Sequence, residues 1–235
     1  EINIGDWSSD VCSSDLPFPA RLGKSGLVWG RGVSLPPAGG PVKKEGDLRS
    51  PAGIFELGGV YGTVPAPQKK RSMPYRRITP RDMWVDDPAS PLYNQHFVLK
   101  HDPVTPWEFK QQMKLNDYAH SLKLFIRHNA ASGREKPVPG AGSSIFFHIW
   151  RRDGGAPTAG CTAMSEENLR AMIAWLDPSR HPLYILLPAK EYLRLRETRV
   201  VHRKWSTVEV AGIRFSVSPA LRGRKVQVLY DPSDL

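Results

Sequence analysis

The sequence predicts a mainly β fold with peripheral helices, an α+β architecture in which strands dominate. Proline and glycine are abundant, at 22 and 20 residues, and they are scattered rather than periodic, which favours turns and short strands over long helices. Segments rich in β-branched and aromatic residues recur along the chain between these turns. No stretch approaches ~18 consecutive apolar residues, so the chain as given has no predicted membrane span.

The strongest strand signal lies at residues 143–150, which are apolar on both faces and are therefore predicted to form a central strand. Residues 62–94 contain six prolines and are predicted to be an irregular loop that covers or lines a binding site. Further strands are predicted at residues 26–34, 52–57, 95–100, 122–127, 182–187, 208–217 and 226–230.

Two helices have recognisable N-terminal caps. Thr105 precedes a proline and has Glu108 three residues later, as in a capping box, and this helix is expected to end near residue 115. Ser165 precedes two glutamates and an apolar stripe, which predicts a second helix ending before Asp177-Pro178. A third, short helix is expected at residues 190–197.

The chain divides into three predicted parts. Residues 1–16 form an acidic, serine-rich string around Cys12 that resembles sequencing-adapter read-through more than a folded segment, so we expect the native N-terminus, with any signal peptide or anchor, to be missing. Residues 17–197 are predicted to form the main folded domain, and residues 198–235 a C-terminal β extension of unknown role. Cys161 is then the only cysteine of the folded part, which argues against a structural disulfide.

The formal net charge is +10 and the sequence pI is about 9.8. A basic surface favours an anionic partner, whether nucleic acid, anionic lipid or acidic wall polymer, and composition alone does not choose among them. The histidines lack metal-ligand spacing, and no phosphate loop or nucleic-acid motif is present. We therefore expect no metal, no cofactor and no specific nucleic-acid ligand.

The segment from His148 to Cys161 carries the chemistry. A thiol near pKa ~8.5 is mostly protonated at neutral pH, and an imidazole within reach can remove its proton and later protonate a leaving amine. Gly160 allows an unusual backbone conformation before the sulfur, and the backbone N–H groups of Gly160, Cys161 and Thr162 can face a developing oxyanion. A lone cysteine is also among the most often buried residues, so these residues alone leave a structural role open.

Three motifs resemble the L,D-transpeptidase catalytic domain of the YkuD type. They are Glu45-Gly-Asp-Leu-Arg-Ser-Pro-Ala-Gly-Ile-Phe-Glu-Leu57, Ile145-Phe-Phe-His148 and Thr158-Ala-Gly-Cys161, and the resemblance spans about residues 27–187. It implies a β-sandwich or flattened barrel, Cys161 as the nucleophile that forms the acyl-enzyme, and His148 as its general acid and base.

The resemblance also places Thr158 at the family's Ser/Thr position. The chain departs from the usual Ser/Thr-His-Gly-Cys-x-Asn/Arg motif at Ala159 and Ala163, and the loop from the histidine to the cysteine is shorter than usual. These departures leave the choice of acceptor open, with Thr162 or Arg151 as candidate substitutes for the missing polar groups. The predicted substrate-binding residues are Thr158, Tyr93, Asn94, Gln95 and Arg151.

The expected activity is acyl transfer on peptidoglycan stem peptides in the bacterial cell envelope, with an anionic wall matrix as a further partner. Two main alternatives remain, with a basic nucleic-acid binder as an outside option. If water rather than an amine accepts the acyl group, the protein would be a carboxypeptidase or endopeptidase. If the site is inactive, the protein would be a non-catalytic wall-binding module.

Overall fold

The structure is a computed structural model. It describes residues 18–33, 40–67, 72–130, 136–187, 195–210, 213–216 and 222–230. These residues fall into two compact units, Glu1–Leu186 and Leu187–Leu235. The division lies earlier in the chain than the boundary predicted after residue 197.

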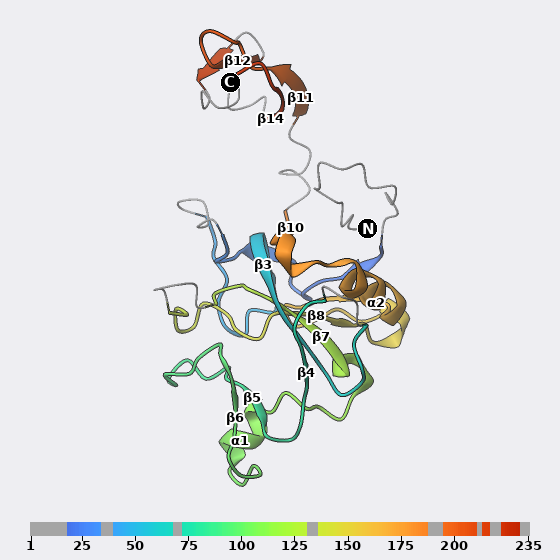
Figure 1. Cartoon of the computed structure of the whole chain (residues 1–235). Helices are drawn as coiled ribbons and strands as arrows, with labels where there is room; N and C mark the ends of the chain where they lie inside the picture. The colour runs from blue at the N-terminus through green and yellow to red at the C-terminus, as the bar shows by residue number, and fades with distance from the viewer. Residues whose placement is uncertain are drawn as a thin grey trace. The chain divides into compact units, whose positions relative to one another are not determined.

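The first unit is built on one mixed sheet (Figure 1). Its main path runs β1(Ala20–Arg21), β9(Thr162–Met164), β8(Phe146–Ile149), β7(Leu122–Ile126), β3(Ser50–Gly62) and β10(Leu183–Leu186). β2(Leu27–Trp29) and β4(Tyr75–Arg77) pair with β3, both in parallel. β8 and β9 are also parallel, whereas the other neighbours on the path are antiparallel.

Side chains alternate between the two faces of this sheet. On β7, Leu122, Leu124 and Ile126 join the larger hydrophobic core, whereas Phe125 belongs to a smaller cluster on the other face. The same alternation separates Phe147 and Ile149 from Phe146 on β8. The larger core is covered by α2(Glu166–Trp175), which contributes the fully buried Leu169 and Ile173.

The smaller cluster lies on the sheet face opposite the larger core. It contains Ile78, Trp84, Met113, Phe125 and Phe146, with Cys161 packed against it. Trp84 comes from β5(Asp82–Trp84), which pairs with β6(His96–Val98). Figure 1 shows this pair grouped with α1(Pro106–Gln111).

Local signals explain both helices. Thr105 caps α1 through a complete capping box with Glu108, and the Ser165 hydroxyl accepts from the backbone N–H of Asn168 at the start of α2. α1 ends at Gln111, before the predicted limit near residue 115. Short 3-10 turns occupy Tyr118–His120, Arg152–Gly154 and Pro178–Arg180.

The second unit contains two antiparallel pairs. β11(Leu195–Val200) pairs with β14(Lys225–Tyr230), and β12(Thr207–Val210) pairs with β13(Ile213–Ser216). The predicted helix at residues 190–197 is wrong where it can be checked, because residues 195–197 belong to β11. Residues 190–194 lie outside the described part.

The prediction of a mainly β fold with few helices is confirmed, and the described sheet does not close into a barrel. Among the described helices, none is long and apolar enough to cross a membrane. The predicted loop at residues 62–94 contains the short strands β4 and β5.

Candidate active site

His148 lies on β8, and Cys161 directly precedes the adjacent parallel strand β9. Phe147 is paired with Thr162 and His148 with Ala163, so Cys161 directly precedes β9 at the level of Phe146. Phe146 and His148 are two residues apart on β8 and therefore project from the same face. Because Cys161 packs in the Phe146 cluster, the thiol and the imidazole share this face of the sheet.

The His148 ring is buried and held in one orientation. Its Nδ1 lies 2.7 Å from the backbone oxygen of Ile149, and a carbonyl oxygen can only accept a hydrogen bond. Nδ1 therefore carries the proton, and Nε2 is left as the basic nitrogen. Burial, followed by the neighbouring His120, lowers the pKa of His148 to about 4, so the imidazole is neutral at pH 7.

A second histidine supports this ring. His120 stacks on His148 with ring centroids 4.7 Å apart. Its Nδ1 lies 2.7 Å from Asp117 Oδ1, and Arg151 Nη2 donates to Asp117 Oδ2 at 2.5 Å. Burial alone would raise the pKa of Asp117, but the bonds from Arg151 and His120 outweigh it and hold this pKa at about 2. An ionised carboxylate thus fixes the ring that packs on His148.

Cys161 retains some exposed surface, but protein surrounds the thiol closely enough for desolvation to raise its pKa. Its Sγ lies 3.5 Å from the Ser144 backbone oxygen. The Phe146 backbone acts in the opposite direction through a hydrogen bond, followed by three cationic side chains, Lys123, Lys43 and Arg151, and all of these favour the thiolate. Among the described residues, the Cys161 backbone N–H has no hydrogen-bond acceptor.

The turn before Cys161 is fixed by two hydroxyl groups. Thr158 Oγ1 donates to the Cys161 carbonyl oxygen at 2.6 Å and accepts from the Gly160 N–H at 3.1 Å. Ser50 Oγ donates to the same carbonyl at 3.2 Å and accepts from the Gly23 N–H at 2.9 Å. The Gly160 amide is therefore engaged within the turn, and Thr158 shapes this turn with the hydroxyl that was predicted to meet substrate.

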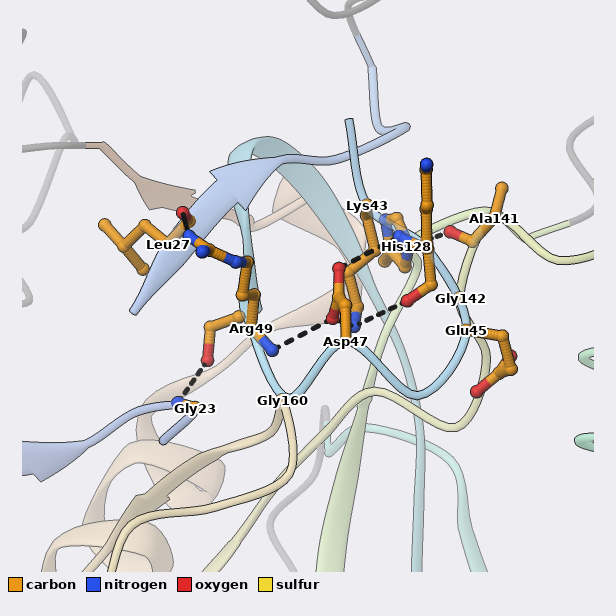
Figure 2. Close-up of polar contacts among 12 residues, drawn as sticks. Gly23, Leu27, Lys43, Glu45, Asp47, Arg49, His128, Ala141, Gly142 and Gly160 are labelled. Atoms are coloured by element: carbon orange, nitrogen blue, oxygen red, sulfur yellow. Dashed lines mark hydrogen bonds and ion pairs between the residues drawn. The ribbon is translucent and has the colours of Figure 1, made fainter. Parts of the chain in front are cut away.

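The loop of residues 43–49, whose conformation is held by hydrogen bonds to Asp47, packs against this turn (Figure 2). The Asp47 carboxylate accepts from buried Lys43 and from the backbone N–H groups of Lys44 and Arg49. Gly160 has a φ of +148°, and a Cβ at this position would lie 3.0 Å from the Arg49 carbonyl oxygen. Glycine is thus required both by the backbone conformation and by the close approach of the loop.

Three of the predicted substrate-binding residues, Tyr93, Asn94 and Gln95, form hydrogen bonds to other protein groups. Tyr93 is buried, and its hydroxyl donates to Glu45. Asn94 is also buried and uses its amide for four hydrogen bonds, to Trp84 Nε1, the Ser144 N–H and the backbone oxygens of residues 128 and 129. Gln95 bonds weakly to the Pro91 carbonyl at 3.4 Å. Tyr93 and Asn94 thus support the fold around the site, because their polar atoms are already satisfied.

The two candidate substitutes for the missing polar groups, Thr162 and Arg151, differ in burial and in the direction of their side chains. Thr162 is buried, and its hydroxyl lies 2.9 Å from that of Tyr184, a residue of the larger core, so its side chain points away from the face that carries Cys161. Arg151 is half exposed and lines a pocket of about 610 Å³ next to the His120–Asp117 pair. The other charged groups of the pocket wall are Asp117, Arg152, Asp153 and Glu166.

Lys123 is a site residue that the sequence analysis missed. It is paired with His148 across β7 and β8 and is buried, with 4% of its surface exposed. The only available signal was a lysine inside a short apolar run, Leu122-Lys-Leu-Phe-Ile126. Asp117 and His120 were missed as well, and their sequence contexts do not distinguish them from ordinary loop residues. Ser50 lies inside the Glu45–Leu57 motif, but no role was assigned to it.

The described residues contain no group of three or more His, Cys, Asp or Glu side chains placed to hold a metal ion. The candidate site comprises a thiol and an imidazole on one face of a mainly β domain.

Comparison with known families identifies this domain. Residues 17–209 match the YkuD family, described as the L,D-transpeptidase catalytic domain, and the chain belongs to this family. Members of the family are cysteine-dependent L,D-transpeptidases that act on peptidoglycan. Residues 186–235 also match the family described as Mu transposase, C-terminal. Comparisons with curated proteins and with solved structures found no match.

Proposed function

We propose that this protein is an L,D-transpeptidase of the bacterial cell envelope that uses Cys161 as its nucleophile and His148 as its general acid and base. The observation that carries the proposal is that His148 on β8 and Cys161, just before the parallel neighbour β9, share one face of the sheet. The substrate would be a peptidoglycan tetrapeptide stem, and the reaction needs no cofactor. The basic chain, at +10, suits an anionic wall matrix outside the cytoplasm.

The first half-reaction follows from the protonation states. Nε2 of His148 accepts the thiol proton as sulfur attacks the carbonyl carbon of the L-centre, and the developing oxyanion accepts from the Cys161 N–H. One such donor contributes about 3 kcal/mol to transition-state stabilisation. The imidazolium then protonates the departing amine of the terminal D-amino acid, leaving a thioester on Cys161.

The resting pair is neutral in this proposal. Burial lowers the pKa of His148 and raises that of Cys161, so both shifts oppose a preformed thiolate–imidazolium pair. Proton transfer would therefore accompany substrate attack rather than precede it.

The pocket beside Arg151 is our candidate route for the amine acceptor. Its wall carries both carboxylates and guanidinium groups, which suits a molecule bearing an ammonium and a carboxylate. Glu166→Gln should slow transfer from the acyl-enzyme to a diamino-acid acceptor without slowing acyl-enzyme formation. Glu167→Gln is the matched control, because Glu167 is the exposed neighbour that does not line the pocket.

The proposal is tested by intact mass after mixing the protein with a tetrapeptide stem, with Cys161→Ser as control. A transient adduct that lacks the terminal residue, absent from the control, is the expected result. Adding an amine acceptor then separates transfer from hydrolysis by the alternative carboxypeptidase or endopeptidase activity. Stem binding without an adduct would contradict the transpeptidase proposal and favour a wall-binding module.

The C-terminal unit supports a second candidate function, nucleic-acid binding. Residues 187–235 hold ten lysines and arginines against five acidic residues, and residues 186–235 match the transposase family. Arg203, Lys204 and Trp205 are exposed, with the Lys204 ammonium 4.7 Å from the Trp205 ring centroid. Retention on duplex DNA that weakens steeply with salt would support this function, and no retention at low salt would exclude it.

A further inference from the structure

Lys123 places a charge where an apolar side chain would be expected. It lies in β7, whose five residues are all buried, and it projects from the same face as His148 and Phe146. Burying an ammonium group is unfavourable unless an opposite charge and hydrogen bonds compensate for the lost hydration. A lysine in this position therefore needs a physical reason.

The hydrogen bonds of this ammonium are incomplete. Lys123 Nζ donates to the Met113 backbone oxygen at 2.9 Å and lies 5.5 Å from the centroid of the Phe146 ring. Among the described residues, this carbonyl is its one hydrogen-bond acceptor, although an ammonium has three donors. The contact with Phe146 places the charge in the cluster against which Cys161 packs.

The charges around Lys123 point to one partner. Desolvation lowers the pKa of Lys123 to about 8, and the ionised Cys161 thiol is the first of the two negative groups that oppose this shift, ahead of Asp117. Asp117 is already paired with Arg151 and His120. Lys43, the other buried lysine that acts on the thiol, is paired with Asp47. The thiolate of Cys161 is thus the anion left for Lys123.

We propose that Lys123 is a positioning residue for the nucleophile, whose buried ammonium supplies the counter-charge of the Cys161 thiolate. The S–H bond breaks, the proton moves to Nε2 of His148, and the electron pair stays on sulfur beside the ammonium. The same positive charge disfavours protonation of its strand neighbour His148 and so keeps the base neutral before attack. This role rests on Cys161 being the nucleophile, as proposed above.

The test measures thiol ionisation and needs no peptidoglycan substrate. Iodoacetamide alkylation of Cys161 is followed from pH 5 to 10 in a Cys12→Ser background, so that Cys161 is the one thiol of the chain. Lys123→Met removes the charge and keeps a similar side-chain length. We expect the alkylation midpoint to rise by about one pH unit and the rate at pH 7 to fall about tenfold.

Three variants make the result specific. Lys123→Gln, which keeps a donor toward the Met113 carbonyl without the charge, should behave as Lys123→Met does and replaces it if that variant does not fold. Lys123→Arg should keep most of the parental rate at pH 7. Lys114→Met, at an exposed lysine beside Met113, should leave the profile unchanged.

Equilibrium unfolding separates this role from a structural one. Because the substitution removes a buried charge, Lys123→Met should be at least as stable as the parent. A folded Lys123→Met or Lys123→Gln protein with the parental pH profile would overturn the proposal. A shifted profile with no acyl-enzyme would leave the role of Lys123 intact and instead contradict the proposed transpeptidase activity.

Discussion

Replacing Gly160 with alanine tests how firmly the turn before Cys161 is held. The φ of +148° lies in a region that is essentially restricted to glycine, and occupying it with another residue costs about 1–3 kcal/mol. The added methyl would also lie 3.0 Å from the Arg49 carbonyl oxygen and 3.3 Å from Ile145 Cδ1. The oxygen belongs to backbone that is bonded to Asp47, so it has little room to retreat.

Adding about 1 kcal/mol for this crowding, we expect Gly160→Ala to lower the free energy of unfolding by about 3 kcal/mol. Gly140→Ala is the matched control. Gly140 has a φ of +75° but no atom within 4 Å of the added methyl, so only the left-handed backbone penalty of about 1 kcal/mol remains.

Urea unfolding of both variants in the Cys12→Ser background gives the two free energies. The difference between them, about 2 kcal/mol, combines the crowding of the added methyl, about 1 kcal/mol, with the larger backbone penalty at Gly160. Equal free energies for Gly160→Ala and Gly140→Ala would refute the reasoning that the loop of residues 43–49 holds the turn.

Two further predictions concern stability. Burial lowers the pKa of His128 and of His148 to about 4, below the unfolded value of about 6.5, so the unfolded chain binds more protons and stability should fall as the pH drops from about 6.5 to 4. Each histidine contributes about 3 kcal/mol, and unfolding measured across this range should show a shallower slope for His128→Gln than for the parent. Ser50→Ala removes a buried hydroxyl that donates to the Cys161 carbonyl and should lower the free energy of unfolding by about 1–3 kcal/mol. Ser25→Ala, at an exposed serine, should change it by less than about 0.5 kcal/mol. Similar values for the two variants would contradict a stabilising role for the Ser50 hydroxyl.

Local chemistry made part of the fold predictable. The caps at Thr105 and Ser165 depend on residues three positions apart, and both are present as expected. The apolar segment around Phe146 and Phe147 is a buried strand because both of its faces are covered. The helix expected at residues 190–197 had no cap to support it, and its described part pairs with β14 instead.

The site was less predictable, because it depends on register and on long-range contacts. The pairing of His148 with both Lys123 and Ala163 is set by how three strands align, and no short motif encodes that alignment. Tyr93 and Asn94 looked like groove residues because polar residues at the end of a loop are usually exposed. In the fold they are buried, since Asn94 joins its own loop to backbone groups of residues 128, 129 and 144.

The two departures from the family motif have different physical meanings. Ala159 is exposed, so the change there affects only what the surface of the turn offers to a ligand. Ala163 is buried and paired with His148, where a larger polar side chain would compete for the space beside the imidazole. With no polar group at either position, ionisation of the thiol is favoured by a backbone hydrogen bond from Phe146 and by charges from elsewhere in the fold, those of Lys123, Lys43 and Arg151. An excess of positive charge around a neutral cysteine–histidine pair becomes most favourable when sulfur carries its negative charge, which is the condition for attack on a carbonyl carbon.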